Sequence, residues 1–364
     1  MTLSRSIIIL FILINKSIVW GQSLTDSTTL ISLSGYAETY FGYASQQSRS
    51  SAKEDFIYSH NLTNQIGVNL AFLKGNLSAA NYRANLALMV GSYAAANLAN
   101  EPAEYRNILE ANVGIKLSKS HNLWLDAGVM PSHIGLESTI SKDCMTLTRS
   151  IIADNSPYFE TGAKLSYTTN DEKWMFAILV LNGWQNIISQ EENNISFGSQ
   201  ITFKPNKKIV LNSSSFIGKV NIFENNLRFF HDLYLTYDLD KKWSLSASFD
   251  IGRQSDNRYN NNTGPHFWNG YALIAEYKIN KKFGLAFRTE RYSDPSAIIL
   301  SGDYTGTDYI MGNSLNFDWH ISQAALWRME AKKFDSDDDL FFDLDPIAFK
   351  NHNYLWTTSI AVAF

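Results

Sequence analysis

Residues 243 to 252 read Trp243-Ser-Leu-Ser-Ala-Ser-Phe-Asp-Ile-Gly252, with apolar side chains at odd positions and small or polar ones at even positions. Successive side chains of a β-strand point to opposite faces, so this alternation predicts a strand with one apolar and one polar face. A tilted strand of about ten residues is long enough to cross the hydrocarbon core of a membrane. The stretch therefore predicts membrane-spanning β-structure.

Similar segments recur from residue 30 to the C-terminus, and about sixteen can be counted by their two-residue period. In the segment 65–72, Val68, Leu70 and Phe72 are predicted to face lipid and Asn69 the interior. The connections alternate between short turns, such as 118–122 and 279–282, and longer loops, such as 93–106 and 131–157. We therefore predict an all-β fold, an antiparallel transmembrane β-barrel with short periplasmic turns and long extracellular loops.

The N-terminus has the pattern of an export signal. Arg5 supplies a positive charge, residues 7–14 are uninterruptedly apolar, and Gly21 offers a small residue for cleavage. We expect a signal peptide over residues 1–21 and an outer-membrane barrel over residues 22–364. Cys144 is the only cysteine, so the exported chain is not stabilised by an intramolecular disulfide.

The composition excludes some partners. The chain has 364 residues, 18% of them charged and 13% aromatic, with a formal net charge of −4 and no basic stripe, so no nucleic-acid partner is expected. The last strand alternates up to Phe364. A terminal aromatic residue on such a strand resembles the signal read by the outer-membrane barrel assembly machinery.

Three stretches carry a family resemblance: 131–137 (Pro-Ser-His-Ile-Gly-Leu-Glu), 149–162 (Arg-Ser-Ile-Ile-Ala-Asp-Asn-Ser-Pro-Tyr-Phe-Glu-Thr-Gly) and 181–187 (Leu-Asn-Gly-Trp-Gln-Asn-Ile). They resemble the putative beta-barrel porin-2 (OmpL-like) family of outer-membrane proteins in Bacteroidota. The resemblance extends over the predicted barrel. It implies a porin fold and the cell outer membrane, and it provides no catalytic residues.

Many charged and amide side chains fall on the polar phase of the predicted strands. An Arg or Lys facing lipid at the bilayer midplane costs about 2–4 kcal/mol, so these side chains are expected to face a wet interior. The pore-lining candidates are Glu38, Arg83, Asn85, Glu110, Lys116, Glu160, Lys164, Glu276, Arg288, Glu290, Arg328 and Glu330. Both signs are present, which predicts weak or locally focused selectivity. Trp124 is an exception, an aromatic residue on the polar phase.

The longest loop, 131–157, mixes apolar and charged residues. A solvated loop would be more uniformly polar, so this one is expected to fold onto the barrel wall. It is either a constriction loop that sets pore size or a surface loop that covers the rim. The constriction candidates are His133, Glu137, Lys142, Asp143, Arg149 and Asp154. His133 is interpreted as a structural hydrogen-bonding residue rather than a pH gate.

An acidic run occupies residues 335–345. It lacks the glycine and the terminal glutamate of a calcium loop, so a solvated loop is favoured over a divalent-cation site that bridges lipopolysaccharide. No metal and no cofactor are predicted.

The sequence has no Gly-x-Ser-x-Gly elbow, His-Glu-x-x-His pair, phosphate loop or dinucleotide fingerprint, so we do not expect an enzyme. The favoured function is an outer-membrane porin-like channel for passive diffusion of small hydrophilic solutes, surrounded by outer-membrane lipid and lipopolysaccharide. The alternatives are a surface receptor or adhesin and, less favoured, a barrel-embedded lipase that would use His231.

Overall fold

The computed structural model describes residues 29–46, 51–189, 195–221, 226–255, 265–300, 307–344 and 347–364. The predicted signal peptide, residues 1–21, lies outside the described residues. No helix within these described ranges is both long and apolar enough to span a membrane.

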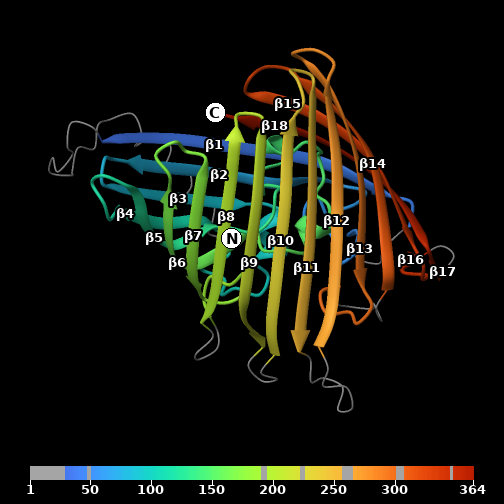
Figure 1. Cartoon of the computed structure of the whole chain (residues 1–364). Coiled ribbons are helices and arrows are strands. Elements are labelled where there is room, and N and C mark those ends of the chain that lie inside the picture. Colours follow the sequence, from blue (N-terminus) through green and yellow to red (C-terminus); the bar gives the residue numbers. More distant parts are fainter. Residues whose placement is uncertain are drawn as a thin grey trace, which may run out of the picture.

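Sixteen antiparallel strands of the described chain close into one barrel, with each strand beside its sequence neighbour and the first beside the last (Figure 1). They are β1 (Leu30–Ala44), β2 (Ile66–Ser78), β3 (Tyr82–Val90), β4 (Ile108–Lys116), β5 (Asn122–Pro131), β6 (Phe159–Thr168), β7 (Trp174–Leu181), β8 (Ser196–Asn206), β9 (Ile209–Asn221), β10 (Asn226–Asp238), β11 (Trp243–Ser255), β12 (Pro265–Lys278), β13 (Phe283–Asp294), β14 (Thr307–His320), β15 (Ala325–Ser336) and β18 (His352–Ala363). The predicted fold class is confirmed.

The remaining elements are short and lie in the loops. A small hairpin, β16 (Phe341–Leu344) and β17 (Ile347–Lys350), stands apart from the barrel sheet. Helix α2 (Ser92–Asn97) lies between β3 and β4, and the 3-10 turn η2 (Ser141–Asp143) and helix α3 (Ile151–Asp154) lie between β5 and β6. The acidic run is therefore partly structured, because Phe341 to Leu344 pairs with Ile347 to Lys350.

The connections differ in length at the two ends of the barrel, as the sequence predicts. Short turns such as 117–121, 239–242 and 279–282 lie at one end of the barrel, and the last two are uppermost in Figure 1. The long connections, including 132–158 between β5 and β6, start from the other end. The C-terminus lies at the short-turn end, where the Ala363 N–H donates to the carbonyl of Ala324 at 2.8 Å.

The outer surface is apolar over most strands. In β11 the odd positions from Trp243 to Ile251 point outward and the even positions are buried inside, as predicted. In β2 the prediction is wrong beyond Asn69. A bulge between the pairs Glu38–Leu70 and Thr39–Val68 inserts one residue, so Leu70 and Phe72 turn inward instead of outward. A bulge reverses facing because the side-chain period is two.

Val68 and Asn69 face outward and inward as predicted, with Val68 41% exposed. Asn69, however, is enclosed rather than wet. Its side chain accepts from the His60 N–H at 2.9 Å and donates to Glu38 at 3.0 Å. A larger residue at position 69 would clash with the surrounding protein. A substitution of Asn69 therefore cannot serve as the control in an experiment that tests which side chains face lipid.

Leu86 and Asn85 in β3 provide a better pair. Leu86 is 56% exposed on the outer surface, and Asn85 points inward, half-buried, toward Asn112. We expect Leu86→Arg to lower the free energy of unfolding by about 2–4 kcal/mol, because it places a charge in lipid, and Asn85→Arg to fold like the parent. Heat-modifiable gel migration across a urea series measures the folded fraction. Equal losses in the two variants would contradict the assigned facing.

Candidate functional site

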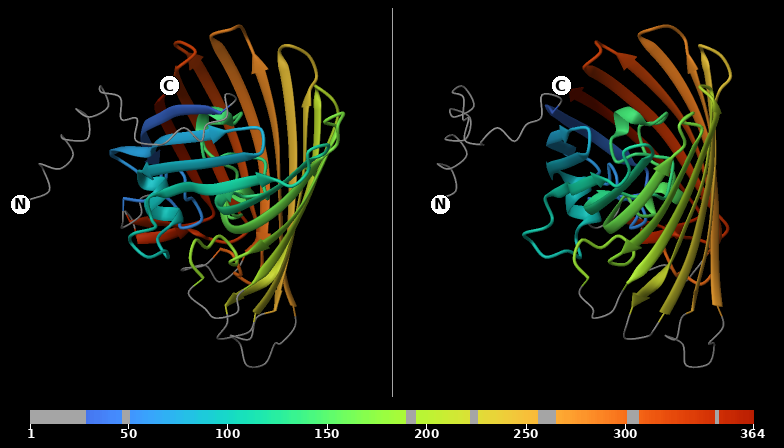
Figure 2. Two further views of the ribbon diagram at one scale, coloured as in Figure 1. Left: turned by 90° about the vertical axis from the view of Figure 1, so that its left-hand side faces the viewer. Right: turned by 60° about the vertical axis from the view of Figure 1, so that its left-hand side comes forward.

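The segment between β5 and β6 lies inside the barrel. Figure 2 shows this part of the chain, in green, running through the lumen between opposite walls. Its residues contact strands far away in sequence: Ser141 reaches Glu38 in β1, and Leu147 donates its N–H to Asn316 in β14 at 3.0 Å. We call residues 132–158 the inward segment.

Arg328 of β15 holds the innermost turn of the inward segment. Its guanidinium is buried and pairs with Asp318, the residue opposite it in β14, at 2.7 and 2.9 Å. The remaining N–H groups donate to four backbone carbonyls, those of Ser141 (2.5 Å), Cys144 (3.1 Å), Met145 (3.2 Å) and Thr146 (3.2 Å). One strand side chain thus supplies donors to four carbonyls of a buried turn of backbone.

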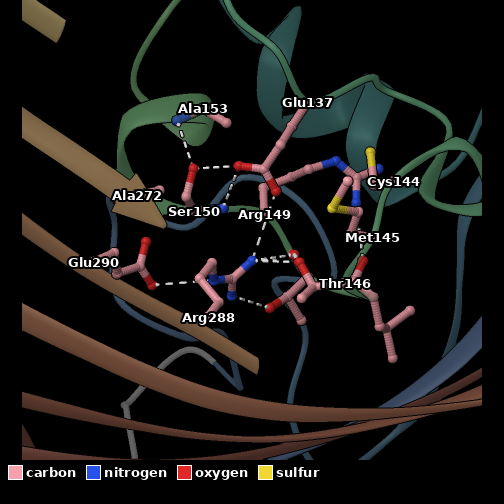
Figure 3. Close-up of polar contacts among 12 residues, drawn as sticks. Glu137, Cys144, Met145, Thr146, Arg149, Ser150, Ala153, Ala272, Arg288 and Glu290 are labelled. Atoms are coloured by element: carbon pink, nitrogen blue, oxygen red, sulfur yellow. Dashed lines mark hydrogen bonds and ion pairs between the residues drawn. The ribbon is translucent and has the colours of Figure 1, made fainter. Parts of the chain in front are cut away.

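Arg288 of β13 holds the next part of the segment. It donates to the Thr146 hydroxyl at 2.8 Å and to the Thr148 carbonyl at 2.6 Å (Figure 3). Three carboxylates surround it: Glu330 at 2.9 Å, Glu290 at 3.6 Å and Glu137 of the segment itself at 3.6 Å. A buried charge is costly unless paired, and here the wall and the segment neutralise Arg288 together.

Carboxylates of the wall accept hydrogen bonds from the segment. Glu38 accepts from the Ser141 hydroxyl at 2.5 Å, Glu330 from the Thr148 N–H at 2.6 Å and Glu290 from the Ile151 N–H at 2.6 Å. Within the segment, the Ser150 hydroxyl caps α3 and donates to Glu137 (Figure 3). Charge-assisted bonds of this kind are stronger than neutral ones, so the segment is fastened at several levels.

His133 fastens the start of the inward segment. Its Nδ1 lies 2.7 Å from Glu160 and its Nε2 lies 2.9 Å from the carbonyl of Ser215 in β9. Burial lowers the pKa of His133, but the Glu160 carboxylate and the Ser215 carbonyl outweigh it, so the pKa is raised. Both ring nitrogens face acceptors, which is the arrangement of a protonated imidazole in a structural role.

Apolar contacts accompany these polar ones. Ile151 and Ile152 of α3 belong to a buried cluster that includes Trp268 and Phe334 of the wall. A second loop, the connection between β1 and β2, contributes to this cluster through its described residues 51–65. Its Phe56 packs edge-on against Phe334 at 5.7 Å, and the Phe56 carbonyl accepts from Asn155 at 3.0 Å. The lumen therefore contains a hydrophobic core of its own, formed where two loops meet the wall.

The second inward loop was missed from the sequence. Lys53 reaches the Thr357 hydroxyl at 2.8 Å, and His60 lies 3.1 Å from Glu38. Both side chains are buried. The apolar residues Phe56 and Ile57, in the connection between β1 and β2, were the available signal.

All twelve pore-lining candidates face the interior, but in two different environments. Under the inward loops, the side chains are enclosed and the expectation of a wet environment is wrong, because backbone and side chains of the loops replace water. These are Glu38, Glu160, Arg288, Glu290, Arg328 and Glu330. The other six candidates lie toward the short-turn end, and five of them have partly exposed side chains. These are Arg83, Asn85, Lys116, Lys164 and Glu276, with Glu110 buried in a 2.5 Å pair with Lys74.

The six loop candidates also divide. Arg149 is buried and donates to the Ser138 and Leu147 carbonyls at 2.6 and 2.9 Å, and Asp154 accepts from Tyr158 at 3.1 Å. Lys142 is half-exposed and Asp143 exposed. His133 and Glu137 connect the segment to the wall as described above, and Arg149 and Asp154 bond within the segment. Four of the six candidates therefore hold the segment together or in place rather than face a channel.

The acidic run behaves as separate pairs. Asp335 lies 2.6 Å from Lys333, Asp343 lies 2.6 Å from Lys350, and Asp337 accepts from Thr307 at 2.7 Å. Asp345 lies outside the described residues. In the part of the chain that the structure describes, no group of three or more histidine, cysteine or acidic side chains is arranged to hold a metal ion.

A closed sixteen-stranded barrel with an apolar outer surface, a polar interior and an inward loop defines a porin-type channel of the outer membrane. The chain matches the family described as putative beta-barrel porin-2, OmpL-like, over residues 30–364, and it belongs to that family. Comparison with curated proteins finds no match.

Solved porin structures share the fold. The anion-selective porin from Comamonas acidovorans has a TM-score of 0.60 at 10% identity, covering 92% of this chain and 100% of that one. OmpF of Salmonella typhi has a TM-score of 0.61 at 11% identity, covering 92% and 97%. The outer membrane channel DcaP of Acinetobacter baumannii has a TM-score of 0.58 at 9% identity, covering 93% and 99%. At these identities the likeness concerns the fold alone.

Proposed function

We propose that the protein is a passive diffusion channel for small hydrophilic solutes, and that the inward segment limits the size of what passes. The observation that carries the proposal is the fastening of residues 141–148 to Arg288 and Arg328 across the lumen. A sixteen-stranded barrel is wide enough to leave an aqueous lumen, so a loop held in its middle acts as a size filter.

The interior at the short-turn end supports an aqueous path. Asn85, Lys116 and Lys164 keep partly exposed side chains there, and Arg83 is paired with Asp126. Polar and charged groups of both signs let hydrated solutes approach without losing all their water. The predicted weak or locally focused selectivity follows from this mixture.

The proposal includes the export route and surroundings of the barrel. Residues 1–21 would direct export, and the barrel assembly machinery would recognise the final strand with Phe364, whose ring lies over Gly35 of β1. Lipopolysaccharide would surround the extracellular rim. Small solutes would be the transported partners.

A barrel-embedded lipase is the second candidate, because His231 does meet a serine. Its Nδ1 lies 2.7 Å from the Ser215 hydroxyl, and the two residues pair across β9 and β10 on the outward phase. Both lie near the middle of their strands, far from the ester groups at the bilayer surface. A hydrolytic dyad also needs an orienting acid, and His231 contacts none among the described residues. We therefore favour a non-enzymatic channel.

We expect the purified protein to give discrete conductance steps in a planar bilayer and to admit small sugars in liposome swelling, because the short-turn half of the lumen is polar. Phospholipid hydrolysis should be undetectable, and Ser215→Ala should conduct like the parent. Folded protein with neither conductance nor solute flux would favour the receptor or adhesin, and hydrolysis abolished by Ser215→Ala would establish the lipase.

A further inference from the structure

A basic cluster lies on the inner wall of β3 to β6 near the short-turn end. Its cations are Arg83, Lys116 and Lys164. The strand register places Arg83 opposite Gly114, Gly114 opposite Asp126, and Asp126 opposite Lys164. The same register places Lys116 opposite Trp124. Four neighbouring strands thus bring three cations around one carboxylate and one indole ring.

Arg83 is held in a fixed position. Its guanidinium makes two hydrogen bonds to the Asp126 carboxylate, at 2.7 and 2.6 Å, and lies 4.3 Å from the ring centre of Trp124. Gly114 makes room for this pair, since a Cβ there would fall 2.2 Å from an Asp126 oxygen. The Arg83 side chain nevertheless stays 37% exposed. This explains why Trp124 lies on the polar phase: its ring supports an arginine that faces the lumen.

The two lysines are not neutralised by neighbours. Lys116 and Lys164 are half-buried on the inner wall, and neither ammonium has an ion-pair or hydrogen-bond partner within the described ranges. The single carboxylate between the cations, Asp126, is buried and already engaged by Arg83. Half-buried cations without partners raise the local potential and favour anions beside them.

Acidic groups elsewhere do not cancel this potential. Glu110 is paired with Lys74 at 2.5 Å, and Glu276, on the opposite wall, lies 3.3 Å from Lys278. The buried carboxylates under the inward segment, such as Glu290 and Glu330, face Arg288 of β13 and backbone N–H groups of the segment. The partly open side of the lumen is therefore basic on the β3–β6 wall.

We propose that the basic cluster is a transient binding site for the carboxylate or phosphate group of small organic anions, which gives the channel a preference for anions. The inference rests on the proposed channel function and specifies its substrate class. Arg83 provides a fixed, planar group suited to two oxygens, and the flexible lysines close around the remaining charge.

The test compares Lys116→Gln/Lys164→Gln with Asp126→Asn, which changes the charge in the opposite direction. Reversal potentials across a potassium chloride gradient should show that the parent prefers anions. The double lysine variant should lower the anion-to-cation permeability ratio by about twofold or more, and Asp126→Asn should raise it. Both effects should shrink at salt near 1 M, where screening extends only about 3 Å. Lys281→Gln, in the exposed turn 279–282, serves as the control and should match the parent.

Equilibrium binding of inorganic phosphate to the detergent-solubilised protein, followed by phosphorus NMR line broadening, provides a readout that needs no conduction. We expect broadening with the parent and its loss in the double lysine variant. A parent that prefers cations, or a double variant with unchanged permeability ratio and unchanged broadening, would overturn the anion site. Phosphate binding without any conductance would instead retain the site and refute the channel.

Discussion

Deleting residues 137–143 is expected to raise the single-channel conductance, on the order of twofold, and to admit larger sugars in liposome swelling. The deletion removes Glu137 and Ser141, which connect the inward segment to Arg288 and to Glu38. Chain shortening itself costs little free energy, and Glu38 retains Asn69 and His60 as partners. We therefore expect the barrel to fold with a less occluded lumen.

A matched control keeps the chain length and changes only side chains that do not anchor the segment. Lys142 is half-exposed and Asp143 exposed, so Lys142→Ala/Asp143→Ala should leave the inward segment in place and the conductance close to that of the parent. A shortened protein that folds and conducts like the parent would show that residues 137–143 do not limit the channel. A variant that fails to fold would show that the segment is required for stability, which circular dichroism and gel migration would detect.

Replacing Arg328 by alanine is expected to lower the free energy of unfolding by about 3–5 kcal/mol. The change leaves the buried Asp318 carboxylate without its countercharge and removes the donors to four carbonyls of the inward segment. The segment should also loosen, which limited proteolysis would reveal by cleavage within residues 141–146. Urea unfolding monitored by gel migration measures the loss.

Two comparisons make this result specific. Arg83→Ala breaks a pair in which the arginine is partly exposed, so it should cost less than Arg328→Ala. Arg328→Met combined with Asp318→Leu removes both buried charges and should recover part of the stability. If Arg328→Ala cost less than about 1 kcal/mol, the hydrogen bonds of Arg328 would not be what holds the inward segment.

The sequence determined the barrel because the alternation of apolar and polar residues is a local property of each strand. Alternation over about ten residues identifies each strand and its lipid-facing side, as in residues 243–252, and the lengths of the connections separate the two ends. The same pattern could not reveal the bulge at Asn69, because a one-residue bulge has no distinctive composition. The bulge nevertheless reverses the facing of every later side chain in the strand. Leu70 and Phe72 were therefore assigned to the wrong face.

Only the tertiary structure decided what the interior contains. The sequence left open whether residues 131–157 enter the lumen or cover the rim, and it did not predict that the loop that includes Lys53 and Phe56 enters the lumen. The contacts that place these loops join residues far apart: Ser141 and Glu38 are 103 positions apart, and Arg328 and Cys144 are 184 apart. No local period encodes such pairs. They form because a closed barrel brings distant strands around one lumen, where buried charges must find partners among whatever backbone and side chains the loops provide.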